Sequence, residues 1–397
     1  PPRIECRRQR QMCIRDRLTP DEIVSELLKG LDILEAEQRG PERHRSMRAV
    51  FDSTWQSLAR PLRSIFAGLS VFRGGFTREG AQQVTGASLM HLSDLAGKSL
   101  IQFDRQRNRY TLHEMLRHYG MERLAEAPDV EAEVRRKHAV YYCGIAQARG
   151  EELRGPRQME AIAVLERDAE NLRLAWRWAI EHRAWPLLKQ AMDALGTFYE
   201  WQGRFQEGQL AFHLAVDALR SHEDGDMRLL LGQALAWQSV FEHLLGSNLQ
   251  ADELIDEALD ILCVESVDDA ELLETSAFAW LRRGIQAYNR NTEAARSGFE
   301  RSLVLYQRID NGWGIAQSLR GLGQVHVDDG EYAEAAVQFR EAIELLRDVG
   351  DRRSEAQILH HLATSQWFAG EHAESMQLAR RSHRLDAELG DRVGLAW

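Results

Sequence analysis

The sequence predicts a mainly α-helical protein in two parts: a group of short helices with one β-hairpin, followed by a stack of helix pairs. Three observations predict this fold. The 397 residues include only 8 prolines and 29 glycines, so few positions break a helix. From about residue 160 onward the sequence repeats itself with a period of 40 residues. Residues 101–103 and 110–112 alternate like two strands around a polar turn.

Charge also differs between the two parts. The whole sequence has a formal charge of −11, from 61 acidic and 50 basic side chains. Residues 39–125 carry +7, whereas residues 126–397 carry −17. Such a contrast indicates modules with different surfaces. No stretch approaches the roughly 18 consecutive apolar residues of a membrane span, so we expect a soluble, cytoplasmic protein without a membrane partner.

Residues 1–17 are set apart as an artefact. Residues 7–17 resemble a translated transposon-end sequencing adapter, with ten codons of one reading frame matched from Arg7 to Asp16. We therefore exclude this segment from the fold and expect the natural chain to extend upstream of Leu18. Because Trp397 falls inside the first helix of a new repeat, we expect the chain to be cut at its C-terminus as well.

Residues 46–125 form the domain that contains the hairpin. Apolar spacing and helix-breaking residues predict four helices, over Met47–Leu58, from Pro61 to Phe72, from Thr77 to Gly86 and over Leu89–Lys98. Strands follow at Ile101–Phe103 and Tyr110–Leu112. Short helices followed by a hairpin are the order of a winged helix, a variant of the helix-turn-helix.

The hairpin turn carries three arginines, Arg105, Arg107 and Arg109. They would suit contact with DNA phosphates, with Leu89–Lys98 as the recognition helix. That helix, however, offers one cation, Lys98, and no arginine for bidentate binding to guanine. The charge of +7 equally suits an acidic protein surface. DNA binding is therefore the alternative hypothesis.

Residues 195–397 consist of repeats of about 40 residues, and residues 126–194 form a helical linker or atypical repeats. The segment that starts at Asn311 aligns with the segments that start at Asp351 and Asp391. Each unit contains two amphipathic helices joined by a turn. The turns begin at glycines, clearly at Gly330 and Gly370 and more weakly at Gly203 and Gly246.

These units resemble tetratricopeptide repeats of the longer, roughly 40-residue kind. Small residues such as Gly323 and Ala335 would let paired helices approach closely, and Gly350 would end a helix. A single pair cannot bury both of its apolar faces, so the pairs are expected to stack into a solenoid. The concave side of such a solenoid offers a groove, where we expect a protein or peptide partner to bind.

Three segments of the first part carry a second resemblance: Arg43–Trp55, Leu69–Phe76 and Tyr110–Tyr119. They are similar to the winged-helix segment of bacterial signal-transduction ATPases of the STAND or NB-ARC type. In that family an ATPase domain and a small helical domain precede the winged helix, and tetratricopeptide repeats often follow as the sensor. Residues 18–45, with a helix from Thr19 to Leu34, are similar to the end of that helical domain. The resemblance implies an ATPase domain as a partner and ATP or ADP as the cofactor of an intact parent, with no cofactor in this chain.

His113 is the candidate residue for nucleotide sensing. Residues 112–114 resemble the Met-His-Asp motif of the family, whose histidine contacts the bound nucleoside diphosphate. The alternative is that His113 caps the helix that follows the second strand. The sequence contains no phosphate-binding loop, no catalytic set and no metal-ligand spacing, so we expect no ATP hydrolysis by this chain alone.

Overall fold

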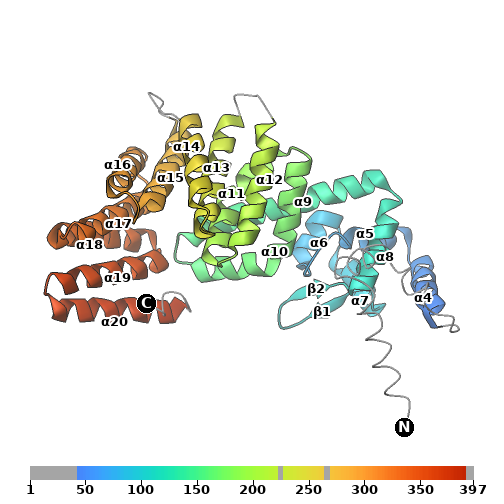
Figure 1. Ribbon diagram of the computed structural model, residues 1–397. Coiled ribbons are helices and arrows are strands. Elements are labelled where there is room, and N and C mark those ends of the chain that lie inside the picture. Colours follow the sequence, from blue (N-terminus) through green and yellow to red (C-terminus); the bar gives the residue numbers. More distant parts are fainter. Residues whose placement is uncertain (1–42, 222–226, 263–268, 390–397) are drawn as a thin grey trace, which may run out of the picture. The chain divides into compact units, whose positions relative to one another are not determined.

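The computed structural model describes residues 43–221, 227–262 and 269–389 (Figure 1). These residues are mostly helical, which confirms the predicted class. The chain divides into two compact units, the first ending at Tyr141 and the second beginning at Tyr142. The adapter-like residues 1–17, the helix expected from Thr19 to Leu34 and the repeat expected from Asp391 lie outside the described residues.

The first unit contains short helices and one hairpin, in the predicted order. Its elements are α4 (Arg43–Ser57), α5 (Arg60–Leu69), α6 (Arg78–Thr85), α7 (Leu89–Gly97), β1 (Gln102–Asp104), β2 (Arg109–Thr111) and α8 (Glu114–Ala125). The two strands pair antiparallel, with Phe103 opposite Tyr110. The hairpin is therefore confirmed, displaced by one residue in each strand from the predicted ranges.

Local hydrogen bonds fix where these helices begin and end. Thr77 Oγ1 accepts a hydrogen bond from Gly80 N at 3.0 Å at the start of α6. At the start of α7, Ser88 and His91 each accept a hydrogen bond from the other's backbone N–H at 3.2 Å, which is a reciprocal cap. Gly86 ends α6 with φ of 73°, a left-handed conformation that favours glycine.

A backbone bridge anchors the hairpin to the segment before α6. Phe76 N donates to Tyr110 O at 2.9 Å, and Tyr110 N donates to Phe76 O at 2.8 Å. The two rings stack with centroids 5.9 Å apart, and Phe72 packs 4.7 Å from Phe76. All three side chains are buried, so the hairpin is part of the core of the first unit.

The second unit is a succession of antiparallel helix pairs, which Figure 1 shows following one another along the colour gradient from green to red. Its helices are the second half of α9 (Pro128–Leu153), α10 (Gln158–Glu181), α11 (Trp185–Trp201), α12 (Phe205–Arg220), α13 (Arg228–Leu244), α14 (Asn248–Ile261), α15 (Ala270–Ala287), α16 (Thr292–Arg308), α17 (Gly312–Asp328), α18 (Tyr332–Val349), α19 (Arg352–Phe368) and α20 (His372–Leu389).

The structure confirms the period of 40 residues. Helices α16, α18 and α20 begin at residues 292, 332 and 372. The same period recurs in the helix caps. Asn311 caps α17 by accepting a hydrogen bond from Gly314 N at 2.9 Å, and Asp351 caps α19 by accepting one from Ser354 N at 2.9 Å.

Glycine serves two purposes in these repeats. The turn residues have φ between 67° and 88°, as at Gly203, Gly246, Gly330 and Gly370. Inside the pairs, a Cβ atom at Gly323 would lie 2.6 Å from the ring of Phe339, so only glycine lets α17 and α18 approach this closely. The helix pairs, their turns and their close packing define a tetratricopeptide-type α-solenoid.

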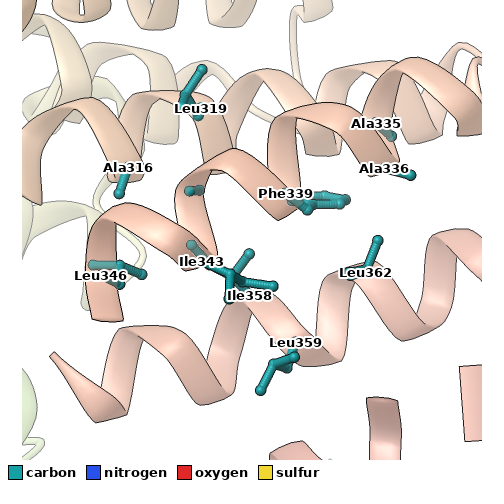
Figure 2. Packing of buried hydrophobic residues seen from close by; sticks show 11 residues of the cluster. Ala316, Leu319, Ala335, Ala336, Phe339, Ile343, Leu346, Ile358, Leu359 and Leu362 are labelled. Atoms are coloured by element: carbon teal, nitrogen blue, oxygen red, sulfur yellow. The ribbon is translucent and has the colours of Figure 1, made fainter. Parts of the chain in front are cut away.

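The repeat core is built from apolar side chains of three successive helices. Phe339 of α18 is fully buried between Leu319 of α17 and Leu362 of α19, together with Ala335 and Ile343 (Figure 2). Each helix therefore buries one face against its predecessor and another against its successor. None of the helices in the described residues is both long and apolar enough to cross a membrane.

Candidate functional site

A long-range polar contact closes the second unit on itself. Gln158, at the start of α10, donates a hydrogen bond from Nε2 to Asp351 Oδ1 at 2.6 Å, across 193 positions of the sequence. Gln158 Oε1 accepts a second hydrogen bond from Arg353 N at 3.3 Å. Both Gln158 and Asp351 are buried. Repeats in a solenoid ordinarily contact only their neighbours, so this contact joins one end of a superhelical turn to the other.

Asp351 is the centre of this closing contact. Its Oδ1 also accepts the capping hydrogen bond from Ser354 N, and its Oδ2 accepts one from the indole Nε1 of Trp313 at 2.9 Å. A fully buried carboxylate is tolerated because several donors replace the water it has lost. Nearby, the guanidinium of Arg154 lies 4.1 Å from the ring centroid of Trp313. We call Gln158, Trp313 and Asp351 the closure.

Backbone packing supports the closure. The ring of Pro156 lies beside Gly350, where an added Cβ atom would meet Pro156 Cδ at 2.9 Å. Gly350 ends α18 with φ of 85°, a left-handed conformation that favours glycine. Its lack of a side chain also leaves room for the ring of Pro156. The sequence identified Gly350 as a helix end and Asp351 as a repeat position, but its pattern gave no signal that the corner between α9 and α10 packs here.

The closure leaves a pocket of about 460 Å³ inside the second unit. Its lining comes from five helices, α9, α11, α13, α15 and α16. The charged side chains of the lining are Glu151, Arg154, Lys189, Asp193, Glu271 and Glu274. Two aromatic side chains, Phe278 and Tyr306, also reach the pocket. A volume of this size lies within the range of about 300–1,000 Å³ that is typical of ligand sites.

Three of the pocket charges already have strong partners. Lys189 Nζ lies 2.5 Å from Glu271 Oε1, which forms a direct ion pair. Asp193 Oδ1 accepts hydrogen bonds from Trp237 Nε1 at 2.8 Å and from Gln233 Nε2 at 3.0 Å. These donors are neutral, so the charge of Asp193 is not cancelled by them.

Glu274 and Tyr306 show the electrostatic character of the pocket. Glu274 Oε1 accepts a hydrogen bond from Asn311 Nδ2 at 3.2 Å. Burial raises the pKa of Glu274 above its ordinary value, the positive charge of Arg154 opposes that change, and the negative charges of Asp193 and Glu271 add to it. Burial also raises the pKa of the Tyr306 phenol, so its hydroxyl stays protonated.

A second ion pair lies on the inner helices of the solenoid. Arg282 donates two parallel hydrogen bonds of 2.7 Å to the carboxylate of Glu200, and its guanidinium lies 4.9 Å from the ring centroid of Phe278. Loss of hydration and the positive charge of Arg282 together lower the pKa of the neighbouring, half-buried Arg320 to about 10. The pair links α11 to α15 through the two terminal nitrogens of Arg282 and both carboxylate oxygens of Glu200.

The three arginines predicted for DNA contact do not form one surface. Arg105 and Arg107 are exposed in the hairpin turn, where Asp104 accepts a hydrogen bond from Arg107 N at 3.1 Å. Arg109 is only 5% exposed, and its guanidinium donates to Gly75 O at 2.8 Å. Arg109 therefore holds the hairpin against the Gly74–Gly75 turn, and only the other two arginines face solvent.

His113 is exposed at the first turn of α8. It is the N-cap residue, and its Nδ1 accepts a hydrogen bond from Met115 N at 3.3 Å. The capping role left open by the sequence is therefore real. The bond occupies Nδ1, and Nε2 has no partner among the residues the structure describes. A hydrogen bond from Arg117 and its positive charge hold the pKa of the adjacent Glu114 at about 2.

The fold and the pocket define the class of this chain: a tetratricopeptide-type solenoid with a pocket that contains several charged side chains, preceded by a helical unit with a β-hairpin. No family model matches the chain. It is 27% identical over 374 residues to proteins of Mycobacterium bovis and Mycobacterium tuberculosis that are provisionally named HTH-type transcriptional regulators. The match covers 89% of this chain, which spans 41% of the length of these relatives.

Two solved structures are similar to the chain. One is a signal transduction ATPase with numerous domains and a tetratricopeptide repeat sensor from Pyrococcus horikoshii, at 16% identity and a TM-score of 0.49, covering 95% of this chain and 58% of that one. The other is a Rap protein in complex with competence and sporulation factor, at 14% identity and a TM-score of 0.46, covering 64% and 78%. With TM-scores below 0.5, neither adds to the fold derived from the helix pairs themselves.

We predict that Gln158→Ala loosens the closure. The substitution leaves the buried Asp351 with one donor fewer, which costs about 1–3 kcal/mol of the free energy of unfolding. Backbone amides at the starts of α17 and α19 should also exchange faster with deuterium. Met159→Ala, on the exposed face of the next position, is the control and should change neither measurement. Equal protection in both variants would show that the contact does not hold the turn closed.

Proposed function

We propose that this chain is the regulatory and sensory portion of a signal-transduction ATPase, and that its solenoid binds a protein or peptide partner. The observation that carries the proposal is the closed turn of helix pairs together with a pocket lined by six charged side chains. Side chains from five helices meet there, so an occupied pocket would change the packing of repeats that are distant in the sequence. Such a site is suited to a sensor.

In this proposal the first unit is a winged helix that couples the solenoid to an ATPase domain outside the chain. The order of four helices, hairpin and helix supports it. So does the exposed ring of His113, which keeps one nitrogen for a nucleotide phosphate while the other caps α8. The chain spans 41% of its mycobacterial relatives, which have room for further domains. Partner binding would shift the balance between resting and active states of the intact protein.

A peptide selection tests partner binding. We expect a library of random dodecapeptides, displayed on phage, to yield sequences that bind the purified chain. Gln190→Trp fills the pocket without changing its charge and should weaken that binding by about tenfold or more. Gln250→Trp, on an exposed position of α14, is the matched control and should leave the affinity unchanged. A library that yields no binder, or binders indifferent to Gln190→Trp, would remove the pocket from the proposal.

Nucleotide chemistry gives a second test. Apart from His113, the nucleotide-binding residues are assigned to a domain outside this chain, so the chain alone should show no ATP turnover. A fluorescent ATP analogue should also bind no more tightly than about 1 mM, the range of non-specific contacts. Release of phosphate from ATP, measured with the purified chain, decides the matter. ATP turnover that co-purifies with the chain would contradict the proposal that the ATPase site lies in another domain.

A DNA-binding transcriptional regulator with a repeat effector domain is the second candidate. The provisional names of the mycobacterial relatives and the two exposed arginines of the hairpin favour it. It predicts duplex binding that weakens steeply with salt, and the Arg105→Ala/Arg107→Ala variant should reduce both the affinity and the salt slope, the slope by about 2. Arg167→Ala/Arg177→Ala, on exposed positions of α10, is the control of equal charge. Absence of duplex binding at low salt removes this candidate.

A further inference from the structure

We propose that the pocket of the second unit receives a basic side chain, lysine or arginine, of the bound peptide. The inference rests on the proposed partner binding and names the chemistry by which the partner is recognised. It is carried by the unequal charge of the pocket and by the hydroxyl of the buried residue Tyr306, which lines the pocket and forms no hydrogen bond with a described residue.

The pocket holds more negative charge than its own cations neutralise. Lys189 is engaged by Glu271. Arg154 stacks on Trp313, and within the described part of the chain no carboxylate lies in ion-pair contact with it. Three carboxylates remain against this one cation: Glu151, Asp193 and Glu274. None of the three forms an ion pair with a described residue, so an incoming ammonium or guanidinium group would meet uncompensated negative charge.

Tyr306 points to the same ligand by independent means. Its side chain is 2% exposed, yet it lines the pocket, and no described residue forms a hydrogen bond with its hydroxyl. The hydroxyl is therefore open to the pocket and available for a hydrogen bond with a ligand. The phenol stays protonated and can accept a hydrogen bond from a ligand N–H through its oxygen.

The backbone of α17 holds the ring of Tyr306 in position. An added Cβ atom at Gly314 would lie 2.3 Å from the Tyr306 ring, so the ring packs directly on the backbone of α17. Phe278 adds a second aromatic ring to the lining. Aromatic faces attract cations most strongly where water is excluded. Carboxylates, a phenol and aromatic rings together form a surface that prefers a cation to an anion or an apolar group.

The charge of the whole solenoid acts in the same direction. Residues 126–397 carry −17, which attracts basic peptides and repels acidic ones before any contact forms. Long-range attraction alone would not distinguish one acidic surface from another. The pocket supplies the local selectivity, and an experiment has to separate the two effects.

The test measures the anisotropy of fluorescein-labelled, N-acetylated hexalysine and hexaglutamate peptides with the full chain at about 0.15 M salt. We expect hexalysine to bind and hexaglutamate not to bind. Asp193→Asn/Glu274→Gln should weaken hexalysine binding by about tenfold. Glu253→Gln/Glu300→Gln removes the same charge from exposed positions outside the pocket and should weaken it by about twofold at most.

Tyr306→Phe provides a readout that does not alter charge. It removes the hydroxyl and keeps the ring, and it should weaken hexalysine binding by about threefold to tenfold. Thermal melting of each variant shows whether the fold is retained, and Tyr306→Phe decides the question if the double variant in the pocket does not fold.

Three results would overturn the inference: no binding of hexalysine, equal binding of hexaglutamate, or equal losses in the pocket variants and the charge control. Each leaves the proposed function to be judged by the selected dodecapeptides. If those peptides bind and respond to Gln190→Trp, the pocket binds a partner of other chemistry. If they do not bind either, both the inference and the proposed function fail.

Discussion

The buried carboxylate of Asp351 is the constraint on which the second unit depends. It gathers donors from three helices: Gln158 of α10, Trp313 of α17 and Ser354 of α19. A buried carboxylate is stable only when its lone pairs are satisfied, so the three segments have to meet together. Because they meet, the end of α9 lies opposite α15 and α16, and the pocket exists. The polar lining is thus a consequence of closure.

The closure changes how stability is distributed among the repeats of the second unit. In an open solenoid, each repeat is stabilised by its own contacts and those of its neighbours, so the end repeats unravel first. Here α10 and α19 contact one another across 193 positions, so opening at either place exposes the other. Distant repeats are coupled by a few hydrogen bonds, and breaking one of them at the buried carboxylate costs about 1–3 kcal/mol. A ligand with modest affinity can therefore shift the balance between closed and loosened turns.

Local signals predicted the fold well, and the site poorly. The turn glycines, the period and the equivalence of Asn311 and Asp351 were all readable, because each depends on a local pattern or on its repetition along the sequence. The pocket could not be predicted from the sequence, since its shape depends on the small rotation of each helix pair relative to the next, which accumulates over many repeats. Arg109 shows the same limit on a smaller scale. It has the same residue type as Arg105 and Arg107, but it lies in a strand whose inward face is buried.

Asn311 and Asp351 occupy the same place in successive repeats, and the Oδ1 atom of each accepts the hydrogen bond that caps the next helix. The second polar atom of the side chain is a nitrogen in Asn311 and an oxygen in Asp351. The amide nitrogen of Asn311 donates to Glu274 at the pocket, whereas the second oxygen of Asp351 can only accept, and it takes the indole N–H of Trp313. A nitrogen in place of an oxygen at this single atom thus directs Asn311 to a carboxylate of the pocket and Asp351 to the closure. A repeat array can acquire a specialised site in this way without altering the rule by which its units fold.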